Sequence, residues 1–339
     1  MRVLITGGAG FIGSHLAELS LRRGHAVTVL DDLSTGCLEN LAGLHRHAGF
    51  AFVEGSVVEA RTLEPLVGGC DLVYHLAAVV GVELVLQDIV RTIETNVVGT
   101  LELLRCARRH GRRVLIASSS EIYGKSRAIP LAEDGDRLLG ATTSLRWGYS
   151  SSKAADEYLA LGYWRQYGLP VTIARLFNTI GPRQTGRYGM VVPRLVAQAL
   201  DGETLTVFGD GTQTRSFCDV EDTAEALAAL ASHPGTAGEA YNVGSDREIS
   251  IHDLARRILT LVDGPEKSAE QRIRLVPYRQ AYGPGFEDMP RRVPDLAKID
   301  RLLAWRPRRL LDETLERIIA ARRERHAAEA ATGAGPPGP

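Results

Sequence analysis

The segment Arg2–Gly13, RVLITGGAGFIG, decides the fold. Its first five residues form a β-rich apolar run, and Gly7, Gly10 and Gly13 follow it at a GxxGxxG spacing. Glycine at these places permits a tight turn, close approach of the backbone to a pyrophosphate and close packing of a helix on the strand. A helix is expected over Ser14–Arg23, and the free N–H groups at its N-terminus favour a bound phosphate.

The residues after this helix identify the class of ligand. A second strand is expected over Ala26–Leu30, and Asp31 stands at its end with Asp32 beside it. An acid at this position suits a ribose 2′-hydroxyl and repels a 2′-phosphate. No arginine is adjacent, so the segment predicts NAD rather than NADP. The competing interpretation is a structural turn followed by a surface acid, which the complete order of strand, turn, helix, strand and acid disfavours.

The first half of the chain continues to alternate between strands and helices. Several runs are continuously apolar, as in parallel strands that are buried on both faces. Amphipathic stretches of helical length, notably Asp88–Arg109 and Tyr149–Tyr167, lie between them. The expected strands are Arg2–Thr6, Ala26–Leu30, Ala51–Glu54, Leu72–Leu76, Val114–Ser118 and Val171–Leu176. The pattern predicts an α/β fold, a doubly wound parallel Rossmann sheet.

The second half predicts a smaller C-terminal substrate-binding lobe. Turns rich in Gly and Pro separate short elements, and residues 263–295 are expected to form a long loop. Helices are expected over Val191–Leu200, Val220–Ala231, Ile251–Leu261 and Arg308–His326. The expected domains are an NAD-binding domain at 1–177, to which 215–240 returns, a nucleotide-sugar lobe at 178–214 and 241–325, and a disordered tail at 326–339.

Composition excludes several classes of protein. The 339 residues contain 40 Lys+Arg and 41 Asp+Glu, and this near-neutral balance gives no general attraction to nucleic acid or to a membrane surface. Four scattered cysteines without a CxxC pair predict neither a disulfide framework nor a metal site. No apolar run reaches the roughly 18 residues of a membrane span. A strand pattern that begins at the second residue leaves no room for a signal peptide, so a cytoplasmic location is expected.

Two motifs downstream point to alcohol and ketone chemistry. Tyr149 and Lys153 are four residues apart and therefore lie on one face of a helix. A tyrosine, whose pKa is ordinarily near 10, needs a neighbouring positive charge to act as a base at neutral pH. Ser119 ends the fifth strand, at the sheet edge where ligands bind in such folds. A lone YxxxK is common on helix surfaces, and only its combination with the other motifs makes it informative.

Together with Asn96 in TNVVGT and the run His75-Leu-Ala-Ala78, these motifs resemble the extended short-chain dehydrogenase/reductase superfamily, in its nucleotide-sugar branch of NAD-dependent epimerases and dehydratases. The resemblance covers about residues 1–320. It implies that Tyr149 removes the proton of the sugar C4 hydroxyl while hydride passes to NAD⁺. Lys153 would lower the pKa of Tyr149 and hold the nicotinamide ribose, and Ser119 would bind the reacting oxygen. The implied cofactor-binding residues are Gly7, Gly10, Phe11, Ile12, Gly13, Asp31, Asp32, Ser34, Leu76, Ala77, Ala78, Asn96, Tyr149 and Lys153.

The resemblance also implies a substrate site and one departure. The family often has an Asp near the adenine after the third strand, where this chain has Ser56. Arg215 is expected at the diphosphate, because a guanidinium donates two parallel hydrogen bonds. Arg183 and Arg187 are weaker candidates for the same contact. The alternative interpretation of Arg215 is a surface charge without a role in binding. The full set of expected substrate-binding residues is Asn178, Arg183, Val192, Gln213, Arg215 and Arg292.

The pair Ser120-Glu121 indicates which reaction follows C4 oxidation. It resembles UDP-glucuronic acid decarboxylases, whereas 4,6-dehydratases carry Asp-Glu there and simple epimerases lack the acid. The segment around Arg292 resembles the decarboxylase segment whose arginine reaches the active site, although the catalytic hydroxyl there is usually threonine. The implied catalytic residues are thus Ser119, Ser120, Glu121, Tyr149, Lys153 and Arg292. Among them, Glu121 would act as an acid or base and Arg292 as a positive group. A buried structural acid and a loop charge are the bland interpretations of Glu121 and Arg292.

The expectation from this resemblance is NAD-dependent decarboxylation of UDP-glucuronic acid. The product would be UDP-xylose if the ketone is re-reduced, or UDP-4-keto-pentose if it escapes. A UDP-glucuronate or other nucleotide-sugar 4-epimerase is the first alternative, and a 4,6-dehydratase is the second. A silent NAD-binding or RNA-binding regulator is disfavoured because Ser119, Tyr149 and Lys153 are all present. A homodimer is expected through the helices at Asp88–Arg109 and Tyr149–Tyr167, whose apolar residues could equally pack on the sheet.

Overall fold

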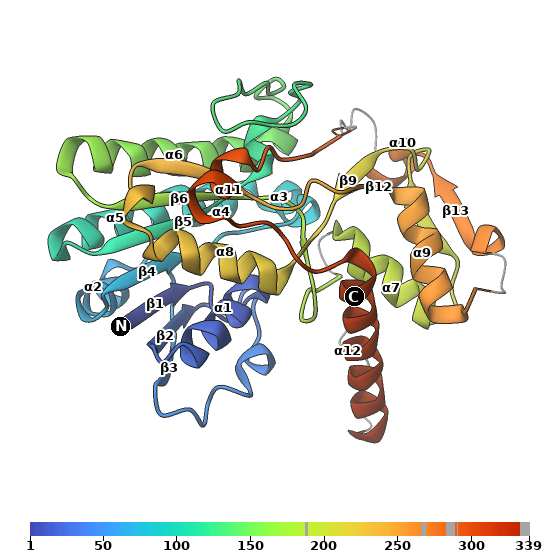
Figure 1. Ribbon diagram of the computed structural model, residues 1–339, viewed down its shortest axis with the longest axis horizontal. Coiled ribbons are helices and arrows are strands. Elements are labelled where there is room, and N and C mark those ends of the chain that lie inside the picture. The colour runs from blue at the N-terminus through green and yellow to red at the C-terminus, as the bar shows by residue number, and fades with distance from the viewer. Residues whose placement is uncertain (187–188, 266–268, 283–288, 290, 333–339) are drawn as a thin grey trace.

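The computed structural model describes residues 1–186, 189–265, 269–282, 289 and 291–332. A seven-stranded sheet in the order β11-β6-β5-β4-β1-β2-β3 forms its centre (Figure 1). Every pairing within this sheet is parallel. Its strands are β1 (Arg2–Thr6), β2 (Ala26–Asp31), β3 (Phe50–Glu54), β4 (Leu72–His75), β5 (Arg113–Ser119), β6 (Val171–Leu176) and β11 (Glu239–Val243). The predicted doubly wound α/β fold is confirmed, and the six predicted strands end within one residue of the observed ones.

Helices cover both faces of the sheet. Figure 1 shows α6 (Gly148–Tyr167) and α8 (Val220–Ser232) on opposite sides of it. One apolar core joins β1 and β2 to α8 and α1 (Phe11–Arg22), through residues such as Leu16 and Leu227. The other core joins β4 and β5 to α6, α2 (Ala60–Gly69) and α5 (Gly99–His110). Strands buried on both faces explain the continuously apolar runs.

The order of the strands positions the site. The chain moves outward from β1 to β2 and β3, and then returns to place β4 on the other side of β1. Where the order reverses, the loops after neighbouring strands diverge and leave a crevice at the carboxyl ends. The glycine segment follows β1, and Ser119 ends β5, so both lie at this edge of the sheet.

A second, smaller unit lies beside the sheet (Figure 1). Its core joins α7 (Val191–Leu200), α9 (Ile251–Asp263) and α12 (Leu311–Thr332). β8 (Leu205–Phe208) pairs in parallel with β13 (Ile273–Val276), and β9 (Thr214–Ser216) pairs antiparallel with β12 (Glu248–Ser250). The remaining elements are α3 (Val82–Gln87), α4 (Ile89–Ile93), β7 (Thr179–Ile180), β10 (Cys218–Asp219), α10 (Tyr278–Tyr282) and α11 (Ala297–Leu303).

Four expectations about the elements are wrong. The helix predicted over Asp88–Arg109 is broken into α4, a π-helical turn at Glu94–Val98 and α5. The stretch 263–295 is not all loop, because β13 and α10 lie within it and β13 finds its partner in β8. Strand β11 continues to Val243 and α11 packs with the sheet core, so parts of 241–325 do not belong to the lobe. The last helix continues to Thr332, beyond the predicted start of the tail at 326, while residues 333–339 lie outside the described part.

Among the described residues, no helix is both long enough and apolar enough to cross a membrane.

Candidate active site

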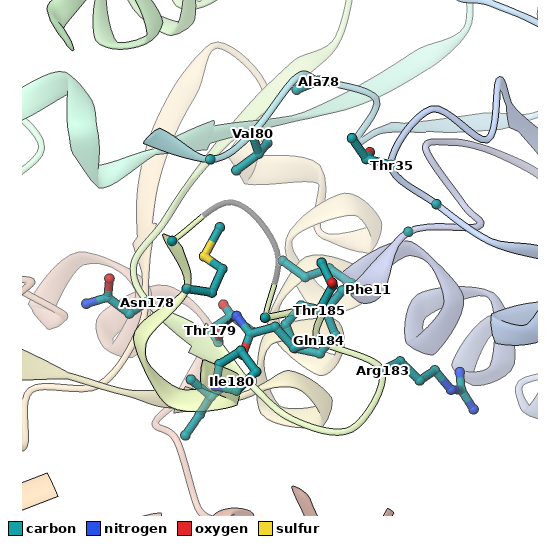
Figure 2. A pocket seen from close by; sticks show the side chains of 18 of the residues that line it. Phe11, Thr35, Ala78, Val80, Asn178, Thr179, Ile180, Arg183, Gln184 and Thr185 are labelled. Carbon is teal, nitrogen blue, oxygen red and sulfur yellow. Dashed lines mark hydrogen bonds between the residues drawn. The ribbon is translucent and has the colours of Figure 1, made fainter. Parts of the chain in front are cut away.

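A cleft of about 2280 Å³ lies along the carboxyl edge of the sheet, between the sheet and the smaller unit. This volume is larger than the 300–1,000 Å³ typical of one small-molecule site, so it has room for a dinucleotide and a second ligand. Phe11, Ala78 and Val80 contribute to one wall from the loops that follow β1 and β4. The segment Asn178–Thr185 faces them across the cleft (Figure 2).

The glycine segment after β1 forms the floor of one end of this cleft. Gly7 has a φ of +71°, and a Cβ there would lie 2.7 Å from the backbone nitrogen of Ala77. A Cβ on Gly13 would lie 2.3 Å from the carbonyl oxygen of Gly7. The backbone therefore folds back on itself more closely than any side chain permits, which leaves the N-terminus of α1 open towards the cleft.

Asp31 and Asp32 line the same end of the cleft. The Asp31 carboxylate accepts hydrogen bonds from the backbone nitrogens of Ala9 and Leu33, both at 2.9 Å, and so ties the glycine segment to β2. Burial raises its pKa above the usual range. Each carboxylate oxygen has a second lone pair, which a ribose hydroxyl can use. Asp32 accepts hydrogen bonds from the backbone and hydroxyl of Ser34. These features fit NAD at this end of the cleft.

Ser119, Tyr149 and Lys153 meet at the middle of the cleft. The Ser119 hydroxyl lies close enough to the Tyr149 phenol to lower the pKa of that phenol. Burial raises the pKa of Tyr149 above its ordinary value, and the Lys153 ammonium opposes this rise. Lys153 is 2% exposed. The arrangement is that of a general acid/base beside a hydroxyl and a buried cation.

Glu121 occupies the adjoining part of the cleft, held between two arginines. Its carboxylate accepts hydrogen bonds from Arg146 at 2.7 Å and from Arg292 at 2.6 Å. Burial raises the pKa of Glu121, but the two guanidinium groups outweigh it and lower the pKa to about 2. The carboxyl is therefore ionised at neutral pH and has no proton to donate. In this state the carboxyl cannot act as the predicted acid, and its two ion pairs make it a weak base.

In the cluster of Arg146, Glu121 and Arg292, two guanidinium groups contact the same carboxylate. Arg146 and Arg292 are 8% and 7% exposed, so water screens their charges little. The Nε atom of Arg292 is buried and has no hydrogen-bond partner among the described residues. The unused donor of Arg292 suits an anionic ligand in the cleft.

The structure brings most predicted site residues to the cleft. The predicted residues that line it are Gly7, Gly10, Phe11, Ile12, Gly13, Asp31, Asp32, Ser34, Leu76, Ala77, Ala78, Ser119, Ser120, Glu121, Tyr149, Lys153, Asn178, Arg183, Val192, Gln213, Arg215 and Arg292. Ser56, at the position of the family's Asp, lines it as well. Asn178 and Gln213 donate their amide hydrogens to the carbonyls of Ser216 and Phe208. Arg215 donates to its neighbour Thr214. Arg187 lies outside the described residues.

Two predicted contacts need correction. Asn96 is fully buried behind the cleft wall, where it accepts a hydrogen bond from the backbone of Val79 and donates one to Ser152. Among the described residues of this turn, Thr95 lines the cleft and Asn96 does not. Asn96 thus supports the cofactor wall rather than forming it. Arg183 points away from its neighbours (Figure 2) and forms an ion pair with Glu18 of α1, so its guanidinium already has a partner other than the expected diphosphate.

Sequence reasoning missed two residues of the site. Arg146 is not among the predicted catalytic residues, yet it holds Glu121 as closely as Arg292 does. Its position three residues before Tyr149 places it at the entry to α6, a signal that could have been used. Asp156 contacts Lys153 at 3.0 Å, and its spacing of one helical turn also indicated this contact.

Residues 3–244 match the NAD dependent epimerase/dehydratase family. The chain belongs to this family. It is 41% identical over 327 residues to the UDP-N-acetyl-alpha-D-glucosaminuronate decarboxylase of Bacillus cytotoxicus, and the match covers 95% of this chain and 98% of that protein. It is 37% identical to UDP-glucuronic acid decarboxylase 1 of Danio rerio, over 94% of this chain and 72% of that protein.

Solved structures of the epimerase/dehydratase family share the fold along nearly the whole chain. The dTDP-glucose 4,6-dehydratase DesIV of Streptomyces venezuelae, crystallised with NAD, is 32% identical, with a TM-score of 0.86 over 97% of this chain and 98% of that one. The UDP-glucuronic acid 4-epimerase of Bacillus cereus, crystallised with UDP-glucuronic acid and NAD, is 28% identical, with a TM-score of 0.85 over 96% and 99%. NAD is the cofactor of this family. The geometry of the glycine segment and Asp31 fits this cofactor.

Proposed function

We propose that this epimerase/dehydratase family member decarboxylates UDP-glucuronic acid with NAD as cofactor, giving UDP-xylose, UDP-4-keto-pentose or both. The observation that carries the proposal is the buried Arg146–Glu121–Arg292 cluster beside Ser119 and Tyr149. A glucuronate has its carboxylate on C5, next to the carbon to be oxidised. A neutral hexose has no anion to offer to these guanidinium groups. The names of the curated relatives support the same reaction.

The side chains in the cleft fit the first step. Tyr149, as a phenolate, takes the proton of the C4 hydroxyl, and Ser119 holds the same oxygen in place through a hydrogen bond. The buried Lys153 ammonium stabilises the phenolate. When bound, NAD⁺ accepts the hydride from C4. The sugar is then a β-keto acid, and Tyr149 is again protonated.

The second step is the loss of CO₂. The bond between C5 and the carboxyl carbon breaks, and its electron pair enters an enolate whose oxygen is the former C4 hydroxyl oxygen. Tyr149 and Ser119 are placed to donate hydrogen bonds to this oxygen, as in an oxyanion hole. A proton then adds to C5 and gives the 4-keto-pentose. Arg146 and Arg292 orient the carboxylate, and Glu121 moderates the positive field that it meets.

A second substrate deserves the same assay. The Bacillus cytotoxicus relative is named for UDP-N-acetyl-alpha-D-glucosaminuronate, which has the same carboxylate on C5 and differs at C2. The chemistry derived for Tyr149 and the arginine cluster is identical for both sugars. The 4-epimerase and 4,6-dehydratase alternatives differ in reaction, and the products separate them.

Mass spectrometry of the products tests this proposal. The protein is incubated with NAD⁺ and, in separate reactions, with UDP-glucuronic acid, UDP-N-acetylglucosaminuronic acid and UDP-glucose. We expect loss of the mass of CO₂ from UDP-glucuronic acid. We expect no reaction of UDP-glucose, whose sugar is neutral. Two additional hydrogens on the product distinguish the pentose from the ketone. An isomer of unchanged mass would establish the epimerase instead, and water loss from UDP-glucose would establish the dehydratase.

We also propose a homodimer formed through α4, the following π-helical turn and α6. Val90, Ile93, Val98 and Tyr158 on these elements are 64%, 44%, 42% and 68% exposed. Clustered apolar side chains in water mark an interaction surface. Light scattering is expected to give twice the chain mass for the wild type and a monomer for Val90→Glu. A wild type that is monomeric at micromolar concentration contradicts the proposal.

A further inference from the structure

Asp156 makes a buried contact that the mechanism above does not use. It lies on α6, one turn beyond Lys153, and its Oδ2 atom is 3.0 Å from the Lys153 Nζ atom. The side chains of Lys153 and Asp156 are 3% and 0% exposed. Burial of an ion pair costs several kcal/mol of desolvation per ion, so this pair is not explained by a gain in stability alone.

The groups around Asp156 define its electrostatic environment. Thr100 of α5 faces the carboxylate and lowers its pKa, whereas burial raises the pKa and dominates. Thr100 also hydrogen-bonds to His75 of β4, at 3.1 Å. Burial lowers the pKa of His75 to about 3, so this imidazole is neutral at working pH. The next acid on the helix, Glu157, is paired with Arg175 of β6 and leaves Lys153 to Asp156.

The Asp156 carboxylate raises the pKa values of both functional residues of the helix. Burial lowers the pKa of Lys153, but Asp156 outweighs this and holds the pKa above its usual value. Burial raises the pKa of Tyr149, Lys153 lowers it, and Glu121 and Asp156 raise it further. The same carboxylate therefore keeps the lysine charged and weakens the effect of that charge on the tyrosine.

We propose that Asp156 is a positioning residue: it anchors the Lys153 ammonium, and its negative charge sets the pH range in which Tyr149 works as the base. The proposal rests on the proposed function only in that Tyr149 is the base. Its distance from the cleft supports a role through Lys153, because Asp156 is absent from the described residues that line the cleft.

Asp156→Asn separates the charge from the anchor. The amide has almost the same shape, and its oxygen still accepts a hydrogen bond from Nζ. Without the negative charge, Tyr149 loses a group that raises its pKa and Lys153 loses the group that keeps it charged. We expect both limbs of the profile of kcat/KM against pH to move to lower pH. On the acid limb, the variant is then roughly three- to tenfold more active than the wild type at the same pH, each relative to its own maximum.

Asp156→Ala and Asp222→Asn complete the experiment. Alanine removes the anchor as well as the charge, so we expect a lower kcat and weaker NAD retention than in Asp156→Asn. Asp222 is a buried acid of α8 that is paired with Arg309 at 2.6 Å, far along the chain from the helix of Lys153. Asp222→Asn is expected to lower the thermal midpoint and leave the pH profile in place, which shows what a merely structural acid does.

A second readout needs no substrate. The phenolate absorbance of the NAD-bound protein is titrated against pH in the wild type and in Asp156→Asn. The same titration of each protein with Tyr149→Phe added is subtracted, so that the difference reports the Tyr149 phenol. A Tyr149 titration at lower pH in Asp156→Asn supports the proposal even if UDP-glucuronic acid is not turned over. If the variant does not fold, the smaller and neutral Asp156→Ser takes its place. Unchanged profiles in both readouts, with folding intact, would overturn the proposal.

Discussion

Tyr149→Phe is expected to abolish oxidation at C4 while NAD stays bound. The variant removes one oxygen atom, the only part of the side chain that can accept and return the C4 proton. General acid/base catalysis by a positioned group contributes roughly 10²- to 10⁴-fold. Since the same oxygen is also placed to stabilise the enolate, we expect a fall in kcat at the upper end of that range. The ion pair of Lys153 with Asp156 does not depend on the phenol and holds the lysine in place.

The measurement is CO₂ release together with the absorbance of reduced cofactor in a single turnover. Tyr167→Phe is the matched control, because Tyr167 lies on the last turn of the same helix, is 49% exposed and is far from the cleft. It is expected to leave both readouts unchanged. Appreciable cofactor reduction by Tyr149→Phe would show that another group takes the C4 proton.

Glu121→Gln is expected to reduce CO₂ release by about 100-fold and to spare NAD binding. Glutamine cannot balance two guanidinium groups, so Arg146 and Arg292 would both turn to the substrate carboxylate. Decarboxylation moves negative charge away from that carboxylate and into the enolate. A stronger positive field at the carboxylate therefore stabilises the reactant more than the transition state and slows the reaction.

The control for this variant is Glu248→Gln. Glu248 holds Arg291, the neighbour of Arg292, in an exposed ion pair at 2.6 Å. Loss of a surface pair costs about 0–1 kcal/mol, so activity and stability are expected to stay near the wild type. If Glu121→Gln releases CO₂ as fast as Glu248→Gln does, the arginine cluster has no role in the reaction.

The same variant has a defined effect on the pH dependence of stability. The pKa of Glu121 is lowered from 4.5 to about 2 in the folded protein. Its ion pairs therefore contribute stability above pH 4.5 that is lost as the pH falls towards 2, about 3 kcal/mol in all. The difference in the free energy of unfolding between wild type and Glu121→Gln should shrink over this range, as measured by urea denaturation at several pH values.

The sequence by itself determined the fold and predicted the groups proposed for the first step. Several of the strands β1 to β6 were predicted because residues buried on both faces are apolar without interruption, which is a local property. The glycine segment was predicted because its turn excludes side chains at fixed spacings. Tyr149 and Lys153 were found because helical periodicity places residues four apart on one face.

Only the tertiary structure decided what surrounds those groups. Arg292 reaches Glu121 across 171 positions of the chain, and its place is set by a contact between distant segments in which the Leu131 N–H donates to the Val293 carbonyl. That pairing converted Glu121 from an expected acid or base into an ionised partner of two arginines. Asn96 lies behind the cleft wall because it is part of a π-helical turn. The spacing of apolar residues in the sequence does not predict this turn. Periodicity describes which face of an element is buried. The charge and the hydrogen bonds of a buried group depend on neighbours from other elements. Those neighbours are fixed only when the layers pack together.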